Sequence, residues 1–185
     1  MDKIIYLASK SPRRQELLTL MGFSYQLLLK DVDESYPSSL ILEEVAVYIS
    51  KKKADAFEIP ENGILITSDT VVILNNELLG KPENNNHAFE MLSKLNGKTH
   101  KVVTGVNLRT ETKNISFSET TEVTFSQLTD EQLWYYIDNH QPFDKAGSYG
   151  IQDWIGMVGV KEINGSYTNV MGLPTERLYR ELANF

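Results

Sequence analysis

Short apolar runs alternate with amphipathic segments along this chain, which is the pattern of a mixed α/β protein. Ile4–Ala8 is an apolar run of strand length, and Tyr25–Leu29 is a second strand candidate. Between them, Ser11-Pro12 offers a helix N-cap followed by proline at the first helical position, and Gly22 offers a helix stop. The N-terminal part of the chain therefore predicts a strand, a helix and a strand.

The same alternation continues to the C-terminus. Leu42–Phe57 has apolar residues at helical spacing, and Thr129-Asp-Glu-Gln132 is a capping box for a helix that ends near Asn139. The other predicted strands are Ile64–Thr67, Val71–Leu74, Val102–Leu108 and Ile115–Phe125, and Asn75-Asn76 is predicted to form a turn after the second of them. The other predicted helices are His87–Leu95 and Thr175–Leu182. Met157–Ile163 and Tyr167–Val170 are predicted to form a hairpin around Asn164-Gly165. We therefore expect an α/β or α+β fold, with a sheet covered by helices.

Composition narrows the class of protein. The chain has 185 residues, of which 41% are apolar and 23% charged, and it contains no cysteine. Disulfides, thiolate metal sites and cysteine nucleophiles are thereby excluded, in keeping with a reducing compartment. No run approaches the roughly 18 apolar residues of a membrane span, and the segment Met1–Leu7 lacks the length and charges of a signal peptide. We therefore expect neither an export signal nor a membrane-embedded part.

Net charge and histidine spacing argue against nucleic-acid binding and against a histidine-based metal site. The net charge of −7 and the lack of a basic stripe interleaved with aromatic residues argue against nucleic-acid binding. The histidines His87, His100 and His140 are scattered without the spacing of metal ligands. A small anionic substrate stays compatible with this composition where basic side chains cluster locally.

Such a cluster is predicted in the segment from Leu7 to Arg14, which reads Leu-Ala-Ser-Lys-Ser-Pro-Arg-Arg. It brings small hydroxyl residues and two arginines to the start of a helix, where unpaired N–H groups and the helix dipole favour an anion. Guanidinium groups match the oxygens of a phosphate. The alternative is a solvated basic helix start, and the P-loop pattern does not occur in the chain.

Two acidic segments are candidates for cation binding or acid–base chemistry. Asp31-Val-Asp-Glu34 is either an acidic surface loop or part of a site for Mg²⁺, which takes one or two carboxylates together with substrate phosphates. Ser68-Asp69-Thr70 interrupts an apolar stretch, and an unpaired buried charge is costly. Asp69 is therefore a metal ligand, a general base for water, or a structural residue of a turn.

Isolated lysines and a glycine-containing loop complete the candidates. Lys53 and Lys81 are either ligands of an anion or solvated lysines. The segment Phe143–Gln152 has glycines that permit close backbone approach to a ligand, or it is an ordinary surface loop. Its polar side chains that could contact a base edge are those of Asp144, Lys145 and Gln152.

Eight segments in this order resemble the Maf family of nucleotide pyrophosphatases, also known as septum formation inhibitor proteins, over essentially the whole chain. They are LASKSPRRQELL from Leu7, DVDE from Asp31, KKKA ending at Ala54, SDTVV from Ser68, LGKP from Leu79, VVTGV from Val102, DKAGSYGIQ from Asp144 and INGSYTNVMGLP from Ile163. The residues Arg13, Thr70 and Gln152 match the subgroup that acts on dTTP and UTP rather than on 7-methyl-GTP.

The resemblance implies a fold and an activity. The fold is a single Maf-like domain over residues 1–185, with a bent central mixed sheet flanked by helices and two lobes with a cleft, as in inosine triphosphate pyrophosphatases. The activity is hydrolysis of dTTP and UTP, and of modified pyrimidine triphosphates, to the monophosphate and pyrophosphate. A divalent cation (Mg²⁺ or Mn²⁺), a homodimer and a cytoplasmic location are also implied. The alternative is a regulatory binding protein that inhibits septum formation through partners.

The resemblance also assigns roles to individual residues. Asp69 is the expected proton acceptor, Glu34 is an expected metal-binding or water-orienting carboxylate, and the two together are the expected metal ligands. Lys53 and Lys81 are expected to be catalytic. The residues expected around the phosphates are Ser9, Arg13, Arg14, Lys53 and Lys81, and those expected to set the base preference are Arg13, Thr70 and Gln152.

Overall fold

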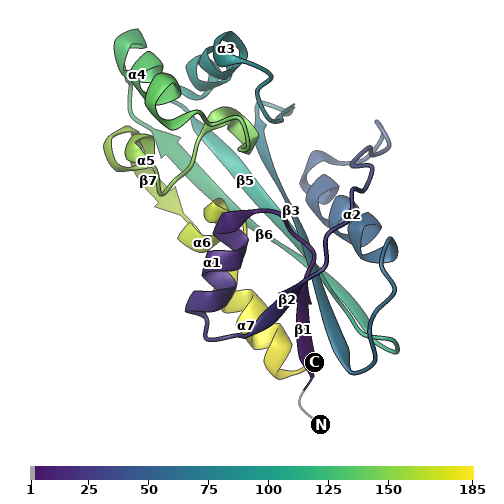
Figure 1. Cartoon of the computed structure of the whole chain (residues 1–185). Coiled ribbons are helices and arrows are strands. Elements are labelled where there is room, and N and C mark those ends of the chain that lie inside the picture. Colours follow the sequence, from purple (N-terminus) through teal and green to yellow (C-terminus); the bar gives the residue numbers. More distant parts are fainter. Residues whose placement is uncertain (1–2) are drawn as a thin grey trace. The chain divides into compact units, whose positions relative to one another are not determined.

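The structure is a computed structural model that describes residues 3–185 (Figure 1). Its strands are β1 (Ile4–Leu7), β2 (Tyr25–Leu27), β3 (Gly63–Leu74), β4 (Glu77–Leu79), β5 (Thr99–Arg109), β6 (Asn114–Phe125) and β7 (Val160–Asn164). Its helices are α1 (Pro12–Leu20), α2 (Leu42–Asp55), α3 (Asn85–Leu95), α4 (Asp130–His140), α5 (Trp154–Gly159), α6 (Tyr167–Met171), α7 (Thr175–Ala183) and the 3₁₀ helix η1 (Ala146–Ser148).

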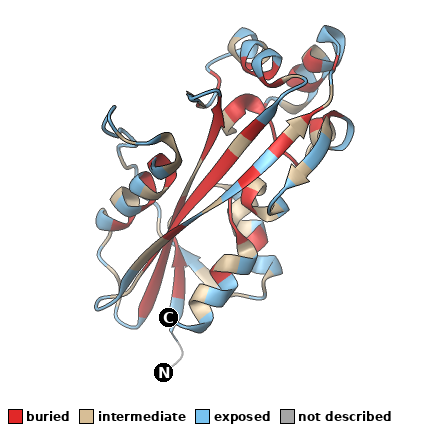
Figure 2. Cartoon of the chain, turned by 180° about the vertical axis from the view of Figure 1, so that it is seen from behind, coloured by how far each residue is buried: buried red, intermediate tan, exposed pale blue. Residues whose placement is uncertain are grey.

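The strands form a mixed sheet in the order β2-β1-β3-β5-β6-β7, with β4 paired to β3. Strand β1 is parallel to both β2 and β3, whereas β4 is antiparallel to β3 and β7 is antiparallel to β6. Buried residues are concentrated on β1, β3 and β5, whereas β2 and β7 have none (Figure 2). The predicted fold class, a mixed sheet flanked by helices, is confirmed. No helix among the residues that the structure describes has the length and apolar composition to cross a bilayer.

The chain divides into two compact units. Unit 1 comprises the residues up to Thr70 together with Thr104–Glu119 and Gly172–Phe185, and unit 2 comprises Val71–Val103 and Thr120–Met171. Strands β3, β5 and β6 contribute residues to both units. The prediction of a single domain over residues 1–185 stays a prediction.

In unit 1, helices lie against both faces of β3. Successive side chains of a strand point to opposite faces. Thr67 donates a hydrogen bond of 2.6 Å to the carbonyl of Ser50 in α2, whereas Thr70 on the other face bonds Arg14 of α1 at 3.0 Å. A Cβ on Gly105 would clash with the backbone of Ala46, so α2 packs directly on the backbone of β5.

Unit 2 contains an extensive apolar core. It includes Leu92 of α3, Phe125 of β6 and Ile137 of α4, all nearly inaccessible to solvent. His100 also lies in this core, where its Nε2 is 2.7 Å from the hydroxyl of Tyr149. Burial lowers the pKa of His100 to about 4, so this imidazole is neutral at physiological pH.

Most predicted elements are confirmed, with ends shifted by a few residues. The capping box is present: Thr129 accepts a bond from the backbone of Gln132, whose side chain bonds back to the N-cap. The predicted turn at Asn75-Asn76 connects β3 and β4, and both asparagines have positive φ.

Two predictions about the elements are wrong. The strands predicted on either side of Ser68-Asp69-Thr70 are one continuous strand, β3, because the polar side chains of Asp69 and Thr70 find partners on the two faces. The predicted hairpin around Asn164-Gly165 is also absent from the described chain. Its first arm is α5 and β7, where β7 pairs with β6, and its second arm is helix α6.

Helix α6 replaces a strand because of local and buried hydrogen bonds. Ser166 accepts a bond from the backbone N–H of Asn169, as an N-cap residue does. The Asn169 amide is buried and donates to the carbonyl of Val102 and to Thr121 Oγ1. These bonds hold the segment as a helical turn.

Candidate active site

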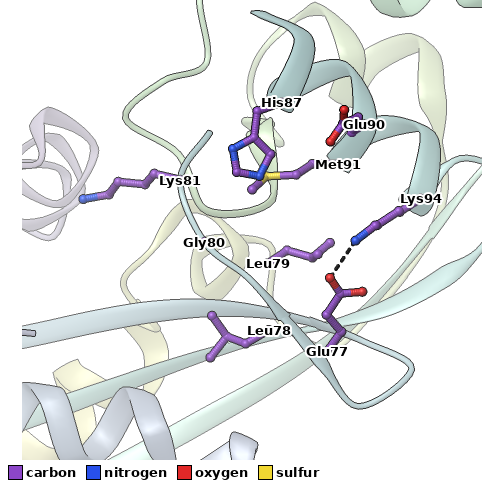
Figure 3. A pocket seen from close by; sticks show the side chains of 9 residues that line it. All are labelled: Glu77, Leu78, Leu79, Gly80, Lys81, His87, Glu90, Met91 and Lys94. Carbon is purple, nitrogen blue, oxygen red and sulfur yellow. Dashed lines mark hydrogen bonds and ion pairs between the residues drawn. The ribbon is translucent and has the colours of Figure 1, made fainter. Parts of the chain in front are cut away.

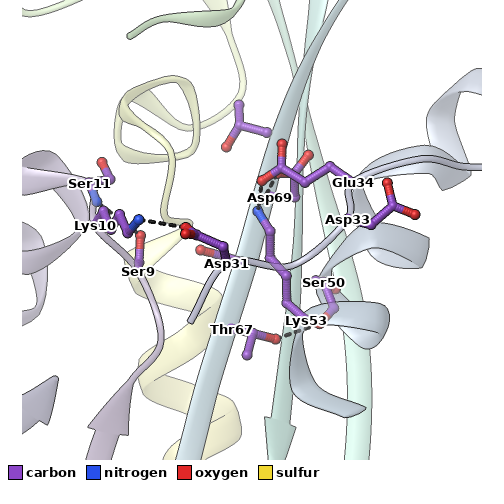
Figure 4. Close-up of polar contacts among 12 residues, drawn as sticks. Ser9, Lys10, Ser11, Asp31, Asp33, Glu34, Ser50, Lys53, Thr67 and Asp69 are labelled. Carbon is purple, nitrogen blue, oxygen red and sulfur yellow. Dashed lines mark hydrogen bonds and ion pairs between the residues drawn. The ribbon is translucent and has the colours of Figure 1, made fainter. Parts of the chain in front are cut away.

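Strand β3, helix α2 and the loop between β2 and α2 bring three of the predicted residues together in unit 1 (Figure 4). Lys53 Nζ, in the last turn of α2, lies 2.8 Å from Asp69 Oδ1 and 2.8 Å from Glu34 Oε1. Asp69 points toward α2 because it shares a strand face with Thr67, whose hydroxyl also bonds α2. The predicted proton acceptor, the second carboxylate and one predicted lysine therefore form one cluster.

The Glu34–Lys53–Asp69 cluster is partly shielded from solvent. The side chains of Lys53 and Asp69 are 15% and 14% exposed, whereas that of Glu34 is 49% exposed. Charges in such a position interact more strongly than charges on an open surface, and loss of one partner leaves the other poorly compensated. Glu34 gives the cluster an open side through which water or an anion can approach.

The three carboxylates of the acidic segment each pair with a different lysine. Asp31 accepts a bond of 2.6 Å from Lys10, and Asp33 accepts one of 2.7 Å from Lys52. The side-chain bond from Lys52 lowers the pKa of Asp33, and that from Lys10 lowers the pKa of Asp31. These two acids therefore hold the loop in place. Glu34, the third acid of the segment, pairs with Lys53, which also pairs with Asp69.

Arg14 lies on the opposite face of β3, where the protein itself occupies most of its donors. Its Nε bonds the carbonyl of Gly172 at 2.8 Å, and its Nη1 bonds the carbonyl of Ser68 at 2.9 Å. Nη1 also bonds Ser9 Oγ at 3.4 Å, and Nη2 bonds Thr70 Oγ1 at 3.0 Å. Arg14 therefore joins the start of α1, strand β3 and the turn before α7.

Arg14 is half-buried, and protein groups surround its guanidinium. Burial lowers the pKa of its guanidinium, and the nearby charges of Asp69 and Glu34 act in the opposite direction, whereas that of Arg13 lowers it further. Arg13, the half-buried neighbour, thus contributes positive charge at the same helix start. Ser9 is also placed there, since its Oγ accepts a bond from the backbone N–H of Ser11 at 3.2 Å.

Lys81 belongs to unit 2 and follows β4. It is exposed and lines a pocket of about 220 Å³ together with residues of β4 and α3 (Figure 3). Figure 3 shows its side chain extending away from His87 and Met91, while Lys94 and Glu77 form an ion pair of 2.6 Å at the other end of the pocket.

Gln152 also belongs to unit 2, and a network of hydrogen bonds sets the direction of its amide. Its Nε2 donates to Asp153 Oδ1 at 3.2 Å, and its Oε1 is buried without a hydrogen-bond partner among the described residues. The other oxygen of Asp153 accepts a bond of 2.8 Å from the hydroxyl of Tyr136. Because a carboxylate only accepts hydrogen bonds, the amide nitrogen of Gln152 faces Asp153, and the amide oxygen remains without a hydrogen-bond donor.

Two residues of the unit 1 site were given no role from the sequence. Thr104 Oγ1 lies 2.9 Å from Thr70 Oγ1 and shares a hydrogen bond with it. Gly172 has a φ of 113°, and its carbonyl is the acceptor for Arg14 Nε. Thr104 lies in the motif VVTGV, and Gly172 lies in the motif INGSYTNVMGLP. Membership of these motifs is the sequence signal that could have pointed to the two residues.

The carboxylates of Glu34 and Asp69 fit a hard divalent cation that brings further oxygen ligands with it. Among residues 3–185, no group of three or more histidine, cysteine, aspartate or glutamate side chains could hold a metal ion. A pair of carboxylates that converges on one cationic atom is nevertheless the set that Mg²⁺ uses when substrate phosphates complete its shell.

Fold and site together define a mixed α/β protein with a carboxylate–lysine centre beside an arginine-bearing helix start. Solved structures of Ham1 proteins from Staphylococcus aureus and Coxiella burnetii are similar to it, with TM-scores of 0.52 and 0.53 at 16% and 12% identity. These similarities cover 97% and 99% of this chain and 100% of each Ham1 chain. At this identity the likeness concerns the fold, and it agrees with the predicted one.

Sequence comparison then identifies the family. Residues 4–185 match the family described as Maf-like protein. A relative from Flavobacterium psychrophilum is 50% identical over 182 residues, covering 97% of this chain and 93% of the relative. Another, from Phocaeicola vulgatus, is 52% identical over 181 residues, covering 96% and 94%. Both relatives bear the name dTTP/UTP pyrophosphatase. This chain belongs to the Maf family, as the ordered motifs predicted.

Proposed function

We propose that this protein hydrolyses dTTP and UTP to the monophosphate and pyrophosphate, and that it thereby removes excess or non-canonical pyrimidine triphosphates. The observation that carries the proposal is the convergence of Glu34 and Asp69 on Lys53 Nζ, at 2.8 Å each. This centre combines a base for water with a mobile cation for phosphate oxygens. The name shared by relatives about half identical to this chain supports the same activity.

The reaction requires a water molecule to be activated beside the α-phosphorus. In the proposed step, the water oxygen bonds to the α-phosphorus, and the bond from that phosphorus to the bridging oxygen of the β-phosphate breaks. Asp69 takes the proton of the water, and pyrophosphate leaves with the electron pair of the broken bond. The cations of Lys53 and Arg13 stabilise the negative charge that develops on the phosphate oxygens.

A divalent cation, Mg²⁺ or Mn²⁺, completes the proposal, with Glu34 and Asp69 as the residues that would hold it. When bound, such an ion lowers the pKa of coordinated water and neutralises charge on the phosphates. Glu34 is half exposed and Asp69 is shielded, so Glu34 orients water from the open side while Asp69 accepts the proton.

The base preference rests on Arg13, Thr70 and Gln152. Because Asp153 holds the amide nitrogen of Gln152, the amide oxygen is left as a hydrogen-bond acceptor. Thymine and uracil carry a matching donor, the N3–H group, where cytosine has an acceptor. Thr70 acts by holding its neighbours in position, because its hydroxyl is already bonded to Arg14 and Thr104.

Lys81 is proposed to contact the phosphates, and the active form is proposed to be a cytoplasmic homodimer.

Pyrophosphate release from a panel of nucleotides tests the proposed function. With Mg²⁺ or Mn²⁺ present, we expect dTTP and UTP to be hydrolysed faster than dCTP, GTP and 7-methyl-GTP. Chelation of the metal should abolish turnover, because the carboxylates of Glu34 and Asp69 repel phosphate oxygens when no divalent cation lies between them. Fastest hydrolysis of 7-methyl-GTP would contradict the assigned base preference. Absence of pyrophosphate release from every nucleotide tested would contradict the proposed activity.

A further inference from the structure

Lys53 occupies the point at which a cation would neutralise both acids of the candidate active site. Its Nζ is 2.8 Å from Glu34 Oε1 and 2.8 Å from Asp69 Oδ1, and Figure 4 shows both carboxylates directed at this atom. Two carboxylates this close to one point repel each other unless a positive charge lies between them. The ammonium group of Lys53 supplies that charge in the free protein.

A divalent cation that bound the same two oxygens would have to take the place of the ammonium group. Two cations cannot share one position between two carboxylates without strong repulsion at short range. The described residues offer no third acid or imidazole that would compensate for this competition. Free metal is therefore opposed by the protein's own lysine.

A triphosphate removes this obstacle. Lysine is a compact charge on a flexible four-carbon stem, and phosphate oxygens are strong partners for it. Lys53 lies in the last turn of α2 and is 15% exposed, so its ammonium group can move toward an anion that enters from the open side at Glu34. The phosphates then supply both a new partner for Lys53 and the missing ligands for the metal.

We propose that Lys53 holds the cation position of the Glu34–Asp69 pair in the free protein, so that a divalent metal binds tightly together with a triphosphate and weakly without one. This inference rests on the proposed function, because it takes a nucleoside triphosphate as the substrate. Lys53 then neutralises Glu34 and Asp69 before the triphosphate binds, and it contacts the phosphate oxygens afterwards. Binding of metal and of nucleotide are coupled through the movement of one side chain.

Lys52 provides a matched control on the same helix. It pairs with Asp33 at 2.7 Å and with the carbonyl of Ser35 at 2.9 Å, whereas Lys53 pairs with Glu34 and Asp69. Removal of either lysine changes the net charge equally. A general increase in negative charge would therefore raise the metal affinity of both variants. Removal of the ammonium group from between Glu34 and Asp69 would raise the metal affinity of the Lys53 variant alone.

The test measures Mn²⁺ binding by electron paramagnetic resonance of the free ion, without nucleotide, on the parent protein and the variants Lys53→Met and Lys52→Met. We expect Lys53→Met to bind Mn²⁺ at least about tenfold more tightly than the parent, because a close like charge is removed. Lys52→Met should bind like the parent. Mn²⁺ should also raise the melting temperature of Lys53→Met more than that of the parent.

A second arm adds a dTTP analogue with a methylene bridge between the α- and β-phosphorus atoms. With this analogue, Mn²⁺ affinity of the parent should rise at least about tenfold as well, since the phosphates draw Lys53 away. If Lys53→Met does not fold, Lys53→Gln, which keeps a neutral polar side chain one bond shorter than lysine, is expected to give the same increase.

Three results would overturn the inference: tight Mn²⁺ binding by the parent without nucleotide, unchanged affinity in the folded Lys53 variant, or an equal increase in Lys52→Met. Pyrophosphate release from dTTP by the same parent preparation tests the proposed function separately. An active parent whose Lys53 variant binds Mn²⁺ no more tightly contradicts the inference alone. A parent that binds Mn²⁺ with the analogue as expected but releases no pyrophosphate contradicts the activity instead.

Discussion

Replacement of Asp69 by asparagine is expected to lower kcat for pyrophosphate release from dTTP by about 10³-fold while the protein stays folded. Asparagine has the size of aspartate and can still accept a hydrogen bond from Lys53 through its amide oxygen. It cannot take a proton from water. The measurement is steady-state pyrophosphate release at saturating dTTP and Mg²⁺, with circular dichroism to confirm the fold.

Asp33→Asn is the matched control for this variant. Asp33 lies in the same acidic segment as Glu34 but pairs with Lys52, away from the proposed reaction. Asparagine keeps an acceptor oxygen for Lys52 and Ser35, so the loop should keep its conformation and kcat should stay near the parent value. Parent-level turnover by Asp69→Asn, or an equal loss in both variants, would show that Asp69 is not the proton acceptor. A cell-division phenotype that persists with folded, inactive Asp69→Asn would favour the regulatory alternative.

The second large effect concerns Arg14, whose replacement by methionine is expected to destabilise unit 1. The carbonyls of Gly172 and Ser68 would lose their buried donor. Each buried group left without a partner costs about 1–3 kcal/mol, so we expect a loss of about 3 kcal/mol or more in the free energy of unfolding. The melting temperature should fall by roughly 10 °C.

Arg14→Lys and Arg13→Met separate geometry from charge. Lysine keeps the positive charge but cannot reach acceptors on three segments at once, so Arg14→Lys should recover little of the lost stability. Arg13→Met removes the same charge one residue earlier and should lower the melting temperature much less. Full recovery by Arg14→Lys, or equal destabilisation by Arg13→Met, would contradict the structural role given to the Arg14 guanidinium.

The fold was largely predictable because local patterns agree with the tertiary structure in most segments. The capping box at Thr129 and the turn at Asn75-Asn76 are local signals, and both occur as expected. Prediction failed where distant partners decide the conformation. Strand β3 continues through Asp69 because Lys53 bonds it, and helix α6 forms with Asn169 bonded to Val102.

The sequence indicated candidate site residues but could not distinguish the contacts of neighbouring residues within a motif. Asp31, Asp33 and Glu34 look equivalent along the chain, yet the first two bind lysines that hold the loop and the third joins Lys53. Arg13 and Arg14 likewise look like a pair of phosphate ligands. Strand alternation and helix phase, which depend on packing, turn Arg14 toward protein acceptors.

Hydrolysis of dTTP in ¹⁸O-enriched water tests most directly the claim that the Asp69 centre activates water for attack on the α-phosphorus. Mass spectrometry of the products after a single turnover locates the oxygen that came from the solvent. We expect one ¹⁸O atom in the dTMP formed, and unlabelled pyrophosphate. Label in the pyrophosphate, or release of inorganic phosphate in place of pyrophosphate, would contradict the account.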